Sequence, residues 1–447
     1  MTIDTITATR MRGMVEAPNG LVDRRIFSDQ DIYALELEQI FARAWNFVAH
    51  DSMIPNPGDF FMTFIGEDRV IVVRDNEGNP RVVVNSCRHR GNAVCRAEEG
   101  HATSFMCTYH GWTYDLKGNL VGVPGFKEVY HEELDRENWG LIRAAQIDSY
   151  HGFIFANMDP EAPNLQEYLG DVGRLSLDHI AARGDMKVVG GVQKYTIPCN
   201  WKLAADNVWD YYHTTTSHAA SIAANYTYVK PGEKALNPIT DRSRFTQPHT
   251  VIPGEYGHAI SGYKITEDST SLGAVSGRAE THRQTEEAQR LLGPVGVAVN
   301  GHPHVFPNMW MTGTQVSLRL PKGPTSTEIW WFTLLEANID EEARKQRVNR
   351  ANHTFGPAGI LEQEDGENWG ESTKAAKGVI SKKHPLNYAM NLRLGEVIID
   401  ELGPPRVETR INEHAQLWYY RAWSDWMSAS SWQDLREHHA AVPRSLM

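Results

Sequence analysis

Short apolar runs rich in β-branched and aromatic residues dominate the chain between residues 58 and 160. Three of them, FFMTFIG, RVIVVRD and PRVVVNS, have the composition and length of strands. The sequences DNEG at residues 75–78 and KGN at residues 117–119 are typical of turns. The segment DPEAP at residues 159–163 has the composition of a linker. We therefore expect a small all-β module that ends near residue 160.

Helical spacing of apolar residues occurs on both sides of this module. Residues 1–27 show no such pattern and predict an irregular arm. Ser28 and Asp31 have the form of a capping box, and residues 202–213 are compatible with a helix. Apolar residues at helical spacing follow Ser28 and recur near the C-terminus: Leu37, Ile40, Phe41 and Ala44, then Tyr419, Ala422, Trp423 and Trp426.

The composition of two further segments predicts their structure. Residues 327–336, TEIWWFTLLE, predict a strand. Residues 228–275 are rich in Gly, Pro, Ser and Thr, which predicts long loops that could form a lid over a site.

Length and composition restrict the class of protein. The chain has 447 residues, and at roughly 150 residues per domain this predicts two or three units. Hydrophobic residues make up 41% and charged residues 22%, as in an ordinary globular protein. No stretch approaches the ~18 uninterrupted apolar residues of a membrane span. These values argue against a disordered, collagen-like or membrane protein.

Charge and cysteine usage narrow the class further. Lys and Arg number 44 against 56 Asp and Glu, a net charge of −12 without a basic run, which argues against nucleic-acid binding. Four cysteines cannot form a disulfide framework. The start, MTIDTITATRMRGMVEAPNG, has no apolar core of a secretory signal. We therefore expect a reducing, cytoplasmic compartment, in which clustered cysteines are read as metal or redox ligands.

The first such cluster pairs Cys87 with His89 and Cys107 with His110. A Cys2His2 structural zinc site is one interpretation. Zinc fingers place their histidines on a helix, whereas these pairs follow predicted strands. The sequences CRHRG and CTYHGW resemble the Rieske [2Fe–2S] motif, in which two Cys bind one iron and two His bind the other. Neutral imidazoles raise the potential of such a cluster, which suits an acceptor of electrons from NADH.

Two cysteines, Cys95 and Cys199, lie outside these pairs. An alternative pairing of Cys95 with His101 is conceivable, although the flanking residues do not match the motif. The simplest interpretation is that both are free, partly buried thiols.

The second cluster contains His213 and His218. On a regular helix, residues five apart point some 140° apart, so the two histidines share a metal only if the helix deforms between them. Asp210 lies one turn before His213, where it can accept a hydrogen bond from the ring nitrogen that does not bind metal. The alternative is a polar helix end with satisfied core histidines.

An acidic segment far downstream offers a third ligand. Residues 356–369, GPAGILEQEDGENW, contain four carboxylates that would usually form a solvated face. One of them could complete a two-His-one-carboxylate triad, which leaves positions on Fe(II) open for O2.

Over essentially its whole length the chain resembles the large (α) subunit of Rieske non-heme iron ring-hydroxylating dioxygenases, above all the actinobacterial enzymes that act on polycyclic aromatic and diaryl compounds. The resemblance implies an α+β fold. It comprises an N-terminal helix, an inserted all-β Rieske domain at residues 45–164, and a helix-grip catalytic domain with an antiparallel sheet formed by residues 1–44 and 165–447.

The resemblance also implies roles for individual residues. Asp210 would link the two centres by bridging His213 to His110 of the adjacent chain, because in this family the cluster of one subunit faces the iron of its neighbour. The implied [2Fe–2S] ligands are Cys87, His89, Cys107 and His110, and the implied ligands of the mononuclear iron are His213, His218 and Asp365.

Some positions depart from the family pattern. Asn207 matches an asparagine near the iron, but two residues separate it from Asp210 where many members have three. Glu364 stands where Asp is common. Phe355 and Leu361 match positions that line the substrate pocket.

The implied function is that of a terminal oxygenase. It would cis-dihydroxylate an aromatic ring, first a polycyclic or diaryl hydrocarbon, with O2 and electrons from NADH. A separate reductase and ferredoxin would deliver the electrons, since the chain has no GxGxxG and no P-loop motif. The expected partners are a small (β) subunit and further copies of the chain, as α3β3 or α3.

Several alternatives stay open from the sequence. The enzyme could oxidise an aromatic carboxylate such as phthalate, which would require an Arg such as Arg319 or Arg283 in the pocket. It could be a Rieske monooxygenase or demethylase. An electron carrier or a zinc protein without enzymatic activity is the remaining class.

Overall fold

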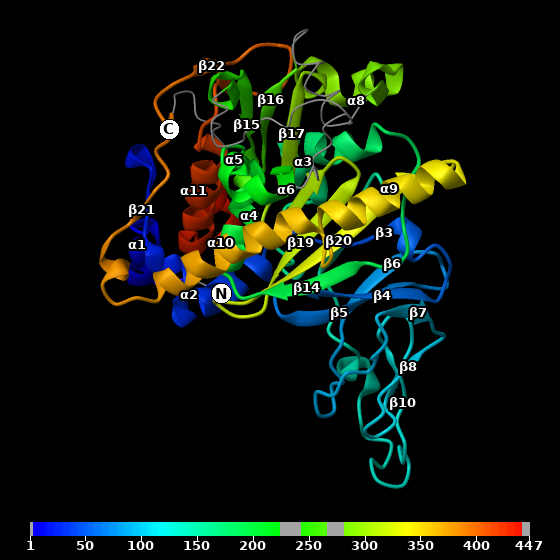
Figure 1. The fold of residues 1–447 in the computed structure, drawn as a ribbon. Helices are drawn as coiled ribbons and strands as arrows, with labels where there is room; N and C mark the ends of the chain where they lie inside the picture. Colours follow the sequence, from blue (N-terminus) through cyan, green and yellow to red (C-terminus); the bar gives the residue numbers. More distant parts are fainter. Residues whose placement is uncertain (1–2, 224–242, 266–280, 440–447) are drawn as a thin grey trace. The chain divides into compact units, whose positions relative to one another are not determined.

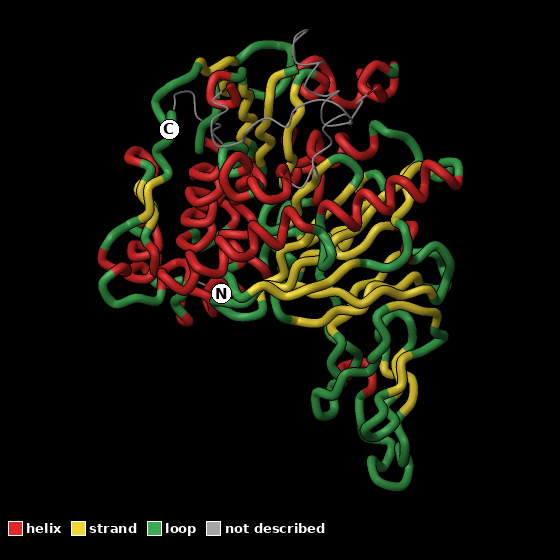
Figure 2. The backbone as a smooth tube through the Cα atoms, viewed as in Figure 1, coloured by secondary structure: helices red, strands yellow, loops and turns green. Residues whose placement is uncertain are grey.

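The computed structural model describes residues 3–223, 243–265 and 281–439 (Figure 1). Residues 41–165 form one compact unit, and residues 1–40 with 166–447 form the other. Helices, strands and loops are mixed along the chain (Figure 2), which confirms the predicted α+β class. Among the described residues, no helix combines the length and the apolar composition that crossing a membrane requires.

The unit of residues 41–165 is built from three small antiparallel sheets. The runs FFMTFIG, RVIVVRD and PRVVVNS become the neighbouring strands β4, β5 and β6, as predicted. The strand bounds are β3 (Asn46–His50), β4 (Asp59–Ile65), β5 (Asp68–Arg74), β6 (Pro80–Val84), β7 (Glu99–His101), β8 (Phe105–Met106), β9 (Thr113–Tyr114), β10 (Leu120–Gly122), β11 (Gln146–Tyr150) and β12 (Phe153–Asn157).

Both predicted turns form, and each depends on one aspartate. Asp75 Oδ1 accepts the backbone N–H groups of residues 77 and 79, and Asp115 Oδ1 accepts those of residues 117 and 119. Gly78 and Gly118 then adopt φ of 86° and 83°, a region in which L side chains are strained. These turns set the register of the strands on either side.

The second unit contains a ten-stranded antiparallel sheet in the order β13-β20-β19-β18-β17-β16-β15-β23-β22, with β14 also paired to β20. The segment TEIWWFTLLE forms β20 over its full predicted length. The bounds are β13 (Met186–Val188), β14 (Gln193–Ile197), β15 (His249–Pro253), β16 (Ala259–Lys264), β17 (Val299–Val305), β18 (Met309–Thr312), β19 (Gln315–Pro321), β20 (Thr327–Glu336), β22 (Glu396–Ile398) and β23 (Arg406–Thr409).

The prediction of loops over residues 228–275 is wrong for part of that segment. Strands β15 and β16 lie within it and pair with each other. All residues of β15 are buried, because the strand is hydrogen-bonded on both sides. The rest of the predicted lid, residues 228–242 and 266–275, lies outside the described part of the chain.

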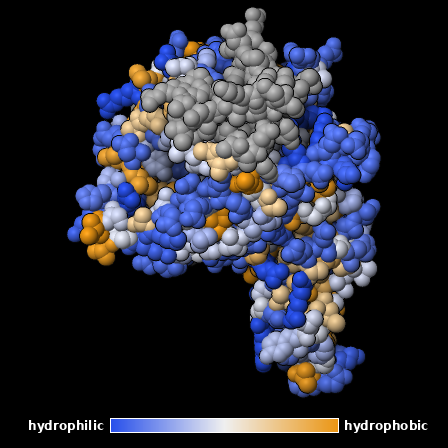
Figure 3. All heavy atoms as spheres, in the orientation of Figure 1, coloured by the Kyte–Doolittle hydropathy of each residue, from blue (hydrophilic) through white to orange (hydrophobic). Residues whose placement is uncertain are grey.

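Helices cover this sheet (Figure 1). Helix α4 packs on β19, α9 on β20, and α11 on β15 and β16, while α10 contacts both α4 and α9. The outer face of α9 is hydrophilic (Figure 3). The bounds are α3 (Leu165–Ala181), α4 (Trp201–Asp206), α5 (Thr214–Ser217), α6 (Ala219–Ala223), α8 (Glu286–Val297), α9 (Glu341–Thr354), α10 (Ile360–Ala376), α11 (His414–Ser428) and α12 (Trp432–His439).

The N-terminal segment is more ordered than its sequence predicts. Helix α1 (Thr5–Arg12) is capped by the side chain of Asp4 and packs on α11. Strands β1 (Val15–Glu16) and β2 (Leu21–Val22) form a small sheet with β21 (Leu386–Asn387). Contacts with distant segments therefore order an arm in which local periodicity is absent.

The first predicted helix exists, but Ser28 does not cap it. Helix α2 (Gln30–Glu36) begins after Asp29, whose carboxylate accepts the N–H groups of Asp31 and Ile32. The chain then continues as a π-helix (Leu37–Phe41). The Ser28 hydroxyl instead donates to the carbonyl of Ala376 at the end of α10.

A buried ion pair joins three helices of this unit. Glu36 at the end of α2 and Lys202 at the start of α4 are both fully buried, with 2.5 Å between Oε1 and Nζ. The indole N–H groups of Trp201 and Trp423 donate to the same carboxylate. Since Trp423 belongs to α11, Glu36 fixes the start of α4 against both neighbours.

We predict that Glu36→Gln lowers the free energy of unfolding by about 3–5 kcal/mol, because it leaves the Lys202 ammonium buried without its counter-charge. Denaturant titration of the purified chain measures the loss. The matched control is Glu38→Gln on the exposed side of the same segment, which should change stability by no more than about 0.5 kcal/mol. Equal stability of the two variants would contradict the anchoring role of Glu36.

Candidate active site

The chain leaves the helical conformation immediately after Asp206. Helix α4 ends there, residues 207–209 form one 3-10 turn, and Asp210 is non-helical at φ −82° and ψ 83°. The sequence of residues 202–213 is compatible with one helix, but the α-helix ends at residue 206. His213 and His218 flank the single turn of α5, whose Thr and Ser residues are poor helix formers. This break removes the 140° divergence that a regular helix would impose.

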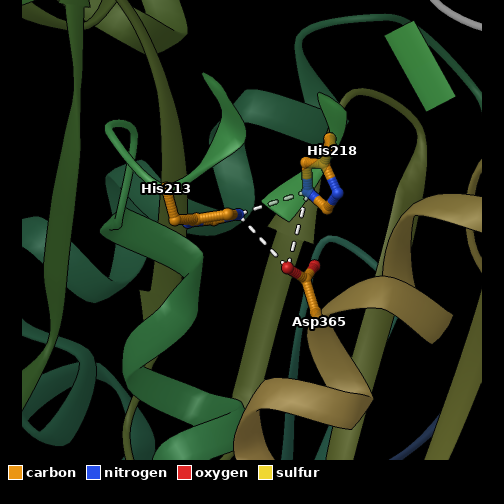
Figure 4. A group of neighbouring side chains, drawn as sticks. All are labelled: His213, His218 and Asp365. Atoms are coloured by element: carbon orange, nitrogen blue, oxygen red, sulfur yellow. Dashed lines mark hydrogen bonds and ion pairs between the residues drawn. The ribbon is translucent and has the colours of Figure 1, made fainter. Parts of the chain in front are cut away.

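The two histidines converge with Asp365 of α10 (Figure 4). The Nε2 atoms of His213 and His218 lie 3.2 Å apart. Asp365 Oδ1 lies 3.2 Å from Nε2 of His213 and 3.5 Å from Nε2 of His218. The histidines come from the broken helix, and the carboxylate comes from the second turn of α10. Asp365 thus meets two histidines that lie 147 and 152 positions before it in the chain, and the three donor atoms face one point.

Each histidine is held from behind by its own carboxylate. Asp210 Oδ1 lies 3.3 Å from Nδ1 of His213 and accepts the backbone N–H of His213 at 3.1 Å. Glu364 Oε2 lies 2.9 Å from Nδ1 of His218 and accepts the hydroxyl of Ser221. Such partners fix the orientation and tautomer of a metal-binding imidazole, so that Nε2 faces the metal.

Glu364 is a site residue for which sequence reasoning gave no role. Its neighbour Asp365 completes the triad pattern in the sequence, whereas Glu364 only departs from the family pattern. Two consecutive acidic residues in a helix point about 100° apart. One can therefore be a ligand while the other reaches the back of a second ligand.

The three donor atoms fit a divalent metal ion. Ligand bonds of about 2.1 Å place adjacent donors roughly 3.0–3.4 Å apart, close to the observed triangle. Burial lowers the pKa of His213. The carboxylates of Asp210 and Asp365 raise the pKa by more than burial lowers it, so that the resulting pKa is about 10. The site thus favours positive charge, and two neutral histidines with one carboxylate form the set typical of non-heme Fe(II).

A buried network holds the ligand-bearing turn of α10. Glu362, one turn before Asp365, forms an ion pair with Arg319 of β19 at 2.6 Å. It also accepts hydrogen bonds from Trp331 and Tyr195. The guanidinium of Arg319 is enclosed by tryptophan rings: Trp310, Trp331 and Trp369.

The unit of residues 41–165 carries two loops that share one pattern of backbone hydrogen bonds. In the first, the N–H of Cys87 donates to the carbonyl of Asn92, and the N–H of Gly91 donates to the carbonyl of Cys87. In the second, Cys107 and Gly111 repeat this pattern, with Trp112 as the acceptor. Gly91 and Gly111 have φ of 75° and 76°, and a Cβ on Gly111 would lie 2.8 Å from Pro124. Glycine is therefore required behind each histidine.

The two sulfur atoms are buried and accept hydrogen bonds. The Tyr114 hydroxyl lies 3.3 Å from Cys87 Sγ and accepts the N–H of Arg88. The side-chain amide of Asn92 donates to Cys107 Sγ at 3.7 Å. Burial opposes ionisation of Cys107, but hydrogen bonds from the backbone N–H of Tyr109 and from the side chain of Asn92 lower its pKa, so the thiolate that a cluster needs is favoured. No pattern in the sequence identifies Tyr114 as a residue of this site.

The two imidazoles lie together at the ends of these loops. His89 stacks on Trp112 at 5.1 Å and meets His110 edge-on at 4.5 Å between ring centroids. Nδ1 of His89 is buried without a hydrogen-bond partner, as expected of a ligand atom. Burial and the charges of His110 and Arg90 lower the pKa of His89, which favours the neutral imidazole.

The four side chains do not meet at one point. Among the described residues, the group whose donor atoms converge closely enough for a single ion is that of His213, His218 and Asp365. A structural zinc site would need the same convergence of Cys87, His89, Cys107 and His110. A [2Fe–2S] cluster spreads its ligands over two irons instead, so the pairs fit the cluster better.

The remaining cysteines are free thiols, as their isolation in the sequence suggests. Cys95 Sγ faces the carbonyl of Ala97, whereas His101 pairs with Asp59. The conceivable pairing of Cys95 with His101 is therefore absent. Burial raises the pKa of Cys199 to about 12.

The residue predicted near the iron and the two predicted for the pocket do not line one cavity. Asn207 lines a cavity of about 290 Å³ together with Asp210, His213 and Asp365. Phe355 and Leu361 are not among the residues of that cavity. Phe355 stacks on Trp331 at 4.6 Å and meets Trp310 edge-on at 5.8 Å.

Two Cys–His loops on an all-β unit, with a two-His-one-carboxylate site between a sheet and its helices, define a Rieske-type non-heme iron oxygenase. Family models agree with both parts. Residues 44–135 match the Rieske [2Fe-2S] domain, and residues 173–429 match the ring hydroxylating alpha subunit, catalytic domain. The chain belongs to the family of ring-hydroxylating dioxygenase alpha subunits.

Individual relatives cover nearly the whole chain. The biphenyl dioxygenase subunit alpha of Paraburkholderia xenovorans is 36% identical over 96% of both chains. The biphenyl 2,3-dioxygenase subunit alpha of Rhodococcus jostii is 36% identical over 97% of this chain and 94% of its own. The solved structure of a naphthalene 1,2-dioxygenase from Rhodococcus sp., bound to indole, superposes with a TM-score of 0.80 at 32% identity, covering 96% of this chain and 99% of that one.

We predict that Glu364→Gln weakens binding of the mononuclear iron by about 10–100-fold, because the amide no longer holds the His218 ring as a carboxylate does. Titration of the iron-depleted site with Fe(II) measures the affinity, and the visible spectrum reports whether the cluster is intact. Glu367→Gln, an exposed acid on the same helix, is the control and should bind iron as the parent does. Equal affinity of the two variants would contradict the role of Glu364.

Proposed function

We propose that the chain is the terminal oxygenase component that cis-dihydroxylates an aromatic hydrocarbon, using O2 and two electrons that originate from NADH. The observation that carries this proposal is the triangle of His213, His218 and Asp365, with a carboxylate behind each imidazole, in a chain that also carries two Rieske loops. We further propose residues 45–164 as the Rieske domain, and residues 1–44 with 165–447 as the catalytic domain.

Each ligand set has a distinct task in this proposal. Cys87, His89, Cys107 and His110 hold the [2Fe–2S] cluster, and His213, His218 and Asp365 hold Fe(II). Bound Fe(II) with open positions supplies O2 activation. Asp210 and Glu364 orient the two imidazoles, and Arg319 with Glu362 keeps the turn of α10 in place.

The substrate we propose is a polycyclic or diaryl hydrocarbon. Support comes from relatives named as biphenyl and naphthalene dioxygenases. An aromatic carboxylate is less well supported, because the Arg319 charge is already paired with Glu362. Arg283 donates to the carbonyl of Gly296.

The partners we propose follow from the chemistry. Since the sequence has no nucleotide-binding motif, a ferredoxin and its reductase deliver the electrons. A small (β) subunit completes an α3β3 assembly, with α3 as the alternative, and the compartment is the cytoplasm. Asp210 of one subunit accepts a hydrogen bond from His110 of the adjacent chain. The partial exposure of both residues and the exposed ring of Tyr109 beside His110 support this contact.

We predict that the reconstituted system converts biphenyl and naphthalene to cis-dihydrodiols faster than it converts phthalate. Mass spectrometry with 18O2 measures the outcome, because dioxygenation places two labelled oxygen atoms in one product. Preferred turnover of phthalate would contradict the hydrocarbon assignment, and products with one labelled atom would contradict dioxygenation.

We predict that Asp210→Asn keeps both iron centres but slows electron transfer from the cluster to the mononuclear iron by about 10–100-fold. The amide retains the size of the side chain but loses the charge that links the two imidazoles. Stopped-flow oxidation of the reduced cluster, with substrate and O2 present, measures the rate. Glu367→Gln serves again as control, and parental kinetics in Asp210→Asn would exclude the bridging role.

A further inference from the structure

The cavity of about 290 Å³ beside the iron ligands has a mixed lining. Carboxylates, tyrosines, amides and hydroxyls from α4, α10 and α11 and from the loops between them face it, together with the apolar side chains of Leu203, Trp369 and Leu386. A cavity of this volume accommodates several water molecules, since each occupies about 30 Å³. Water in it can exchange protons with the carboxylates of the lining.

Four carboxylates belong to this lining: Asp365, which faces the metal position, and Asp206, Asp210 and Glu413. Asp206 and Glu413 are both only 7% exposed. Like charges in one buried cluster disfavour each other's ionisation, so the cluster as a whole holds a proton more readily than isolated acids do.

The kind of hydrogen-bond partner distinguishes Asp206 from Asp210 and Glu413. Asp210 Oδ1 accepts two backbone N–H groups. Glu413 uses both oxygens as acceptors, one for the Tyr212 hydroxyl and one for the N–H of Met390. A backbone N–H group can only donate a hydrogen bond. Asp206 instead accepts hydroxyls alone, those of Tyr388 and Tyr420, through Oδ2 at 2.9 and 2.5 Å. A hydroxyl can turn to accept a hydrogen bond from a protonated carboxyl.

The titratable groups that face Asp206 come from three segments. Asp210 follows on the same stretch of chain, Tyr388 comes from the segment after β21, and Tyr420 and Glu413 come from α11 and the residue before it. Burial raises the pKa of Asp206 to about 7, the charges of Asp210 and Glu413 act in the same direction, and the two tyrosines oppose them.

We propose that Asp206 is a proton-storing residue that feeds the oxygenase reaction through this cavity. The proposal rests on the proposed function. Dihydroxylation joins one arene, one O2, two electrons and two protons into one cis-dihydrodiol. The O–O bond breaks, two C–O bonds form, the electrons reduce oxygen, and each hydroxyl takes one proton. Asp206 releases one of the two protons to the cavity and takes up another from solvent, and the second proton comes from solvent.

The test is a single turnover of the holoprotein, with both iron centres loaded and the cluster reduced beforehand. It is mixed with naphthalene and O2 across acidic to alkaline pH, and the rate of diol formation is measured. The parent should slow as the pH rises through about 7, since a deprotonated Asp206 has no proton to release. Asp206→Asn accepts the same hydrogen bonds but cannot supply the proton. It should lose about 100-fold in rate and lose this inflection.

A second variant addresses the possibility that Asp206→Asn fails to fold. Tyr420→Phe removes a hydrogen bond that lowers the pKa of Asp206, so the inflection should move to higher pH while iron and cluster are retained. Glu367→Gln, an exposed acid of α10, should keep the parent profile. A solvent deuterium isotope effect that is present in the parent and changed in Asp206→Asn would support the proton route.

Two results would overturn the proposal: Asp206→Asn with the pH profile of the parent, or Tyr420→Phe with an unmoved inflection. Both leave the proposed function intact, because the parent still forms the diol. A loaded and reduced parent that forms no product from any arene would instead contradict the proposed function.

Discussion

The site depends on the end of α4 at Asp206. If that helix continued, His213 and His218 would point some 140° apart, and no position of α10 could bring a carboxylate to both. The 3-10 turn and the non-helical Asp210 redirect the chain, so that the two Nε2 atoms lie 3.2 Å apart. The buried pair of Glu36 and Lys202 fixes the start of α4, and the pair of Arg319 and Glu362 fixes the turn that carries Asp365. Rigid elements on both sides thus hold a short irregular segment in place.

Several carboxylates lie around this segment. Asp365 faces the metal position, Asp210 and Glu364 stand behind the imidazoles, and Asp206 with Glu413 lies farther along the cavity. A bound cation offsets part of this repulsion. Arg319, whose charge interacts with that of Asp365, is paired with Glu362. The carboxylates at the imidazoles therefore stay available for the metal ligands.

The sequence predicts those parts of the molecule that local patterns specify. Strands β4, β5, β6 and β20, the turns at Gly78 and Gly118, and helix α11 follow from composition and periodicity. The two Cys–His loops follow from the short spacing within each Cys–His pair, because two ligands on one short loop must lie close in sequence. The order of the N-terminal arm and the positions of β15 and β16 arise from contacts with distant segments, which periodicity does not record. Glu364, Tyr114 and Asp206 acquire their roles only when the fold brings them to other side chains.

The central claim is that one chain holds both a two-iron cluster and a separate mononuclear iron. The most direct measurement is the content of iron and acid-labile sulfide in the purified protein, determined together with zinc. A [2Fe–2S] cluster contributes two of each, and the site of His213, His218 and Asp365 contributes one further iron. The account therefore predicts an iron-to-sulfide ratio of about 3:2. A ratio of about 1:1 after loading with Fe(II), or zinc without sulfide, would contradict it.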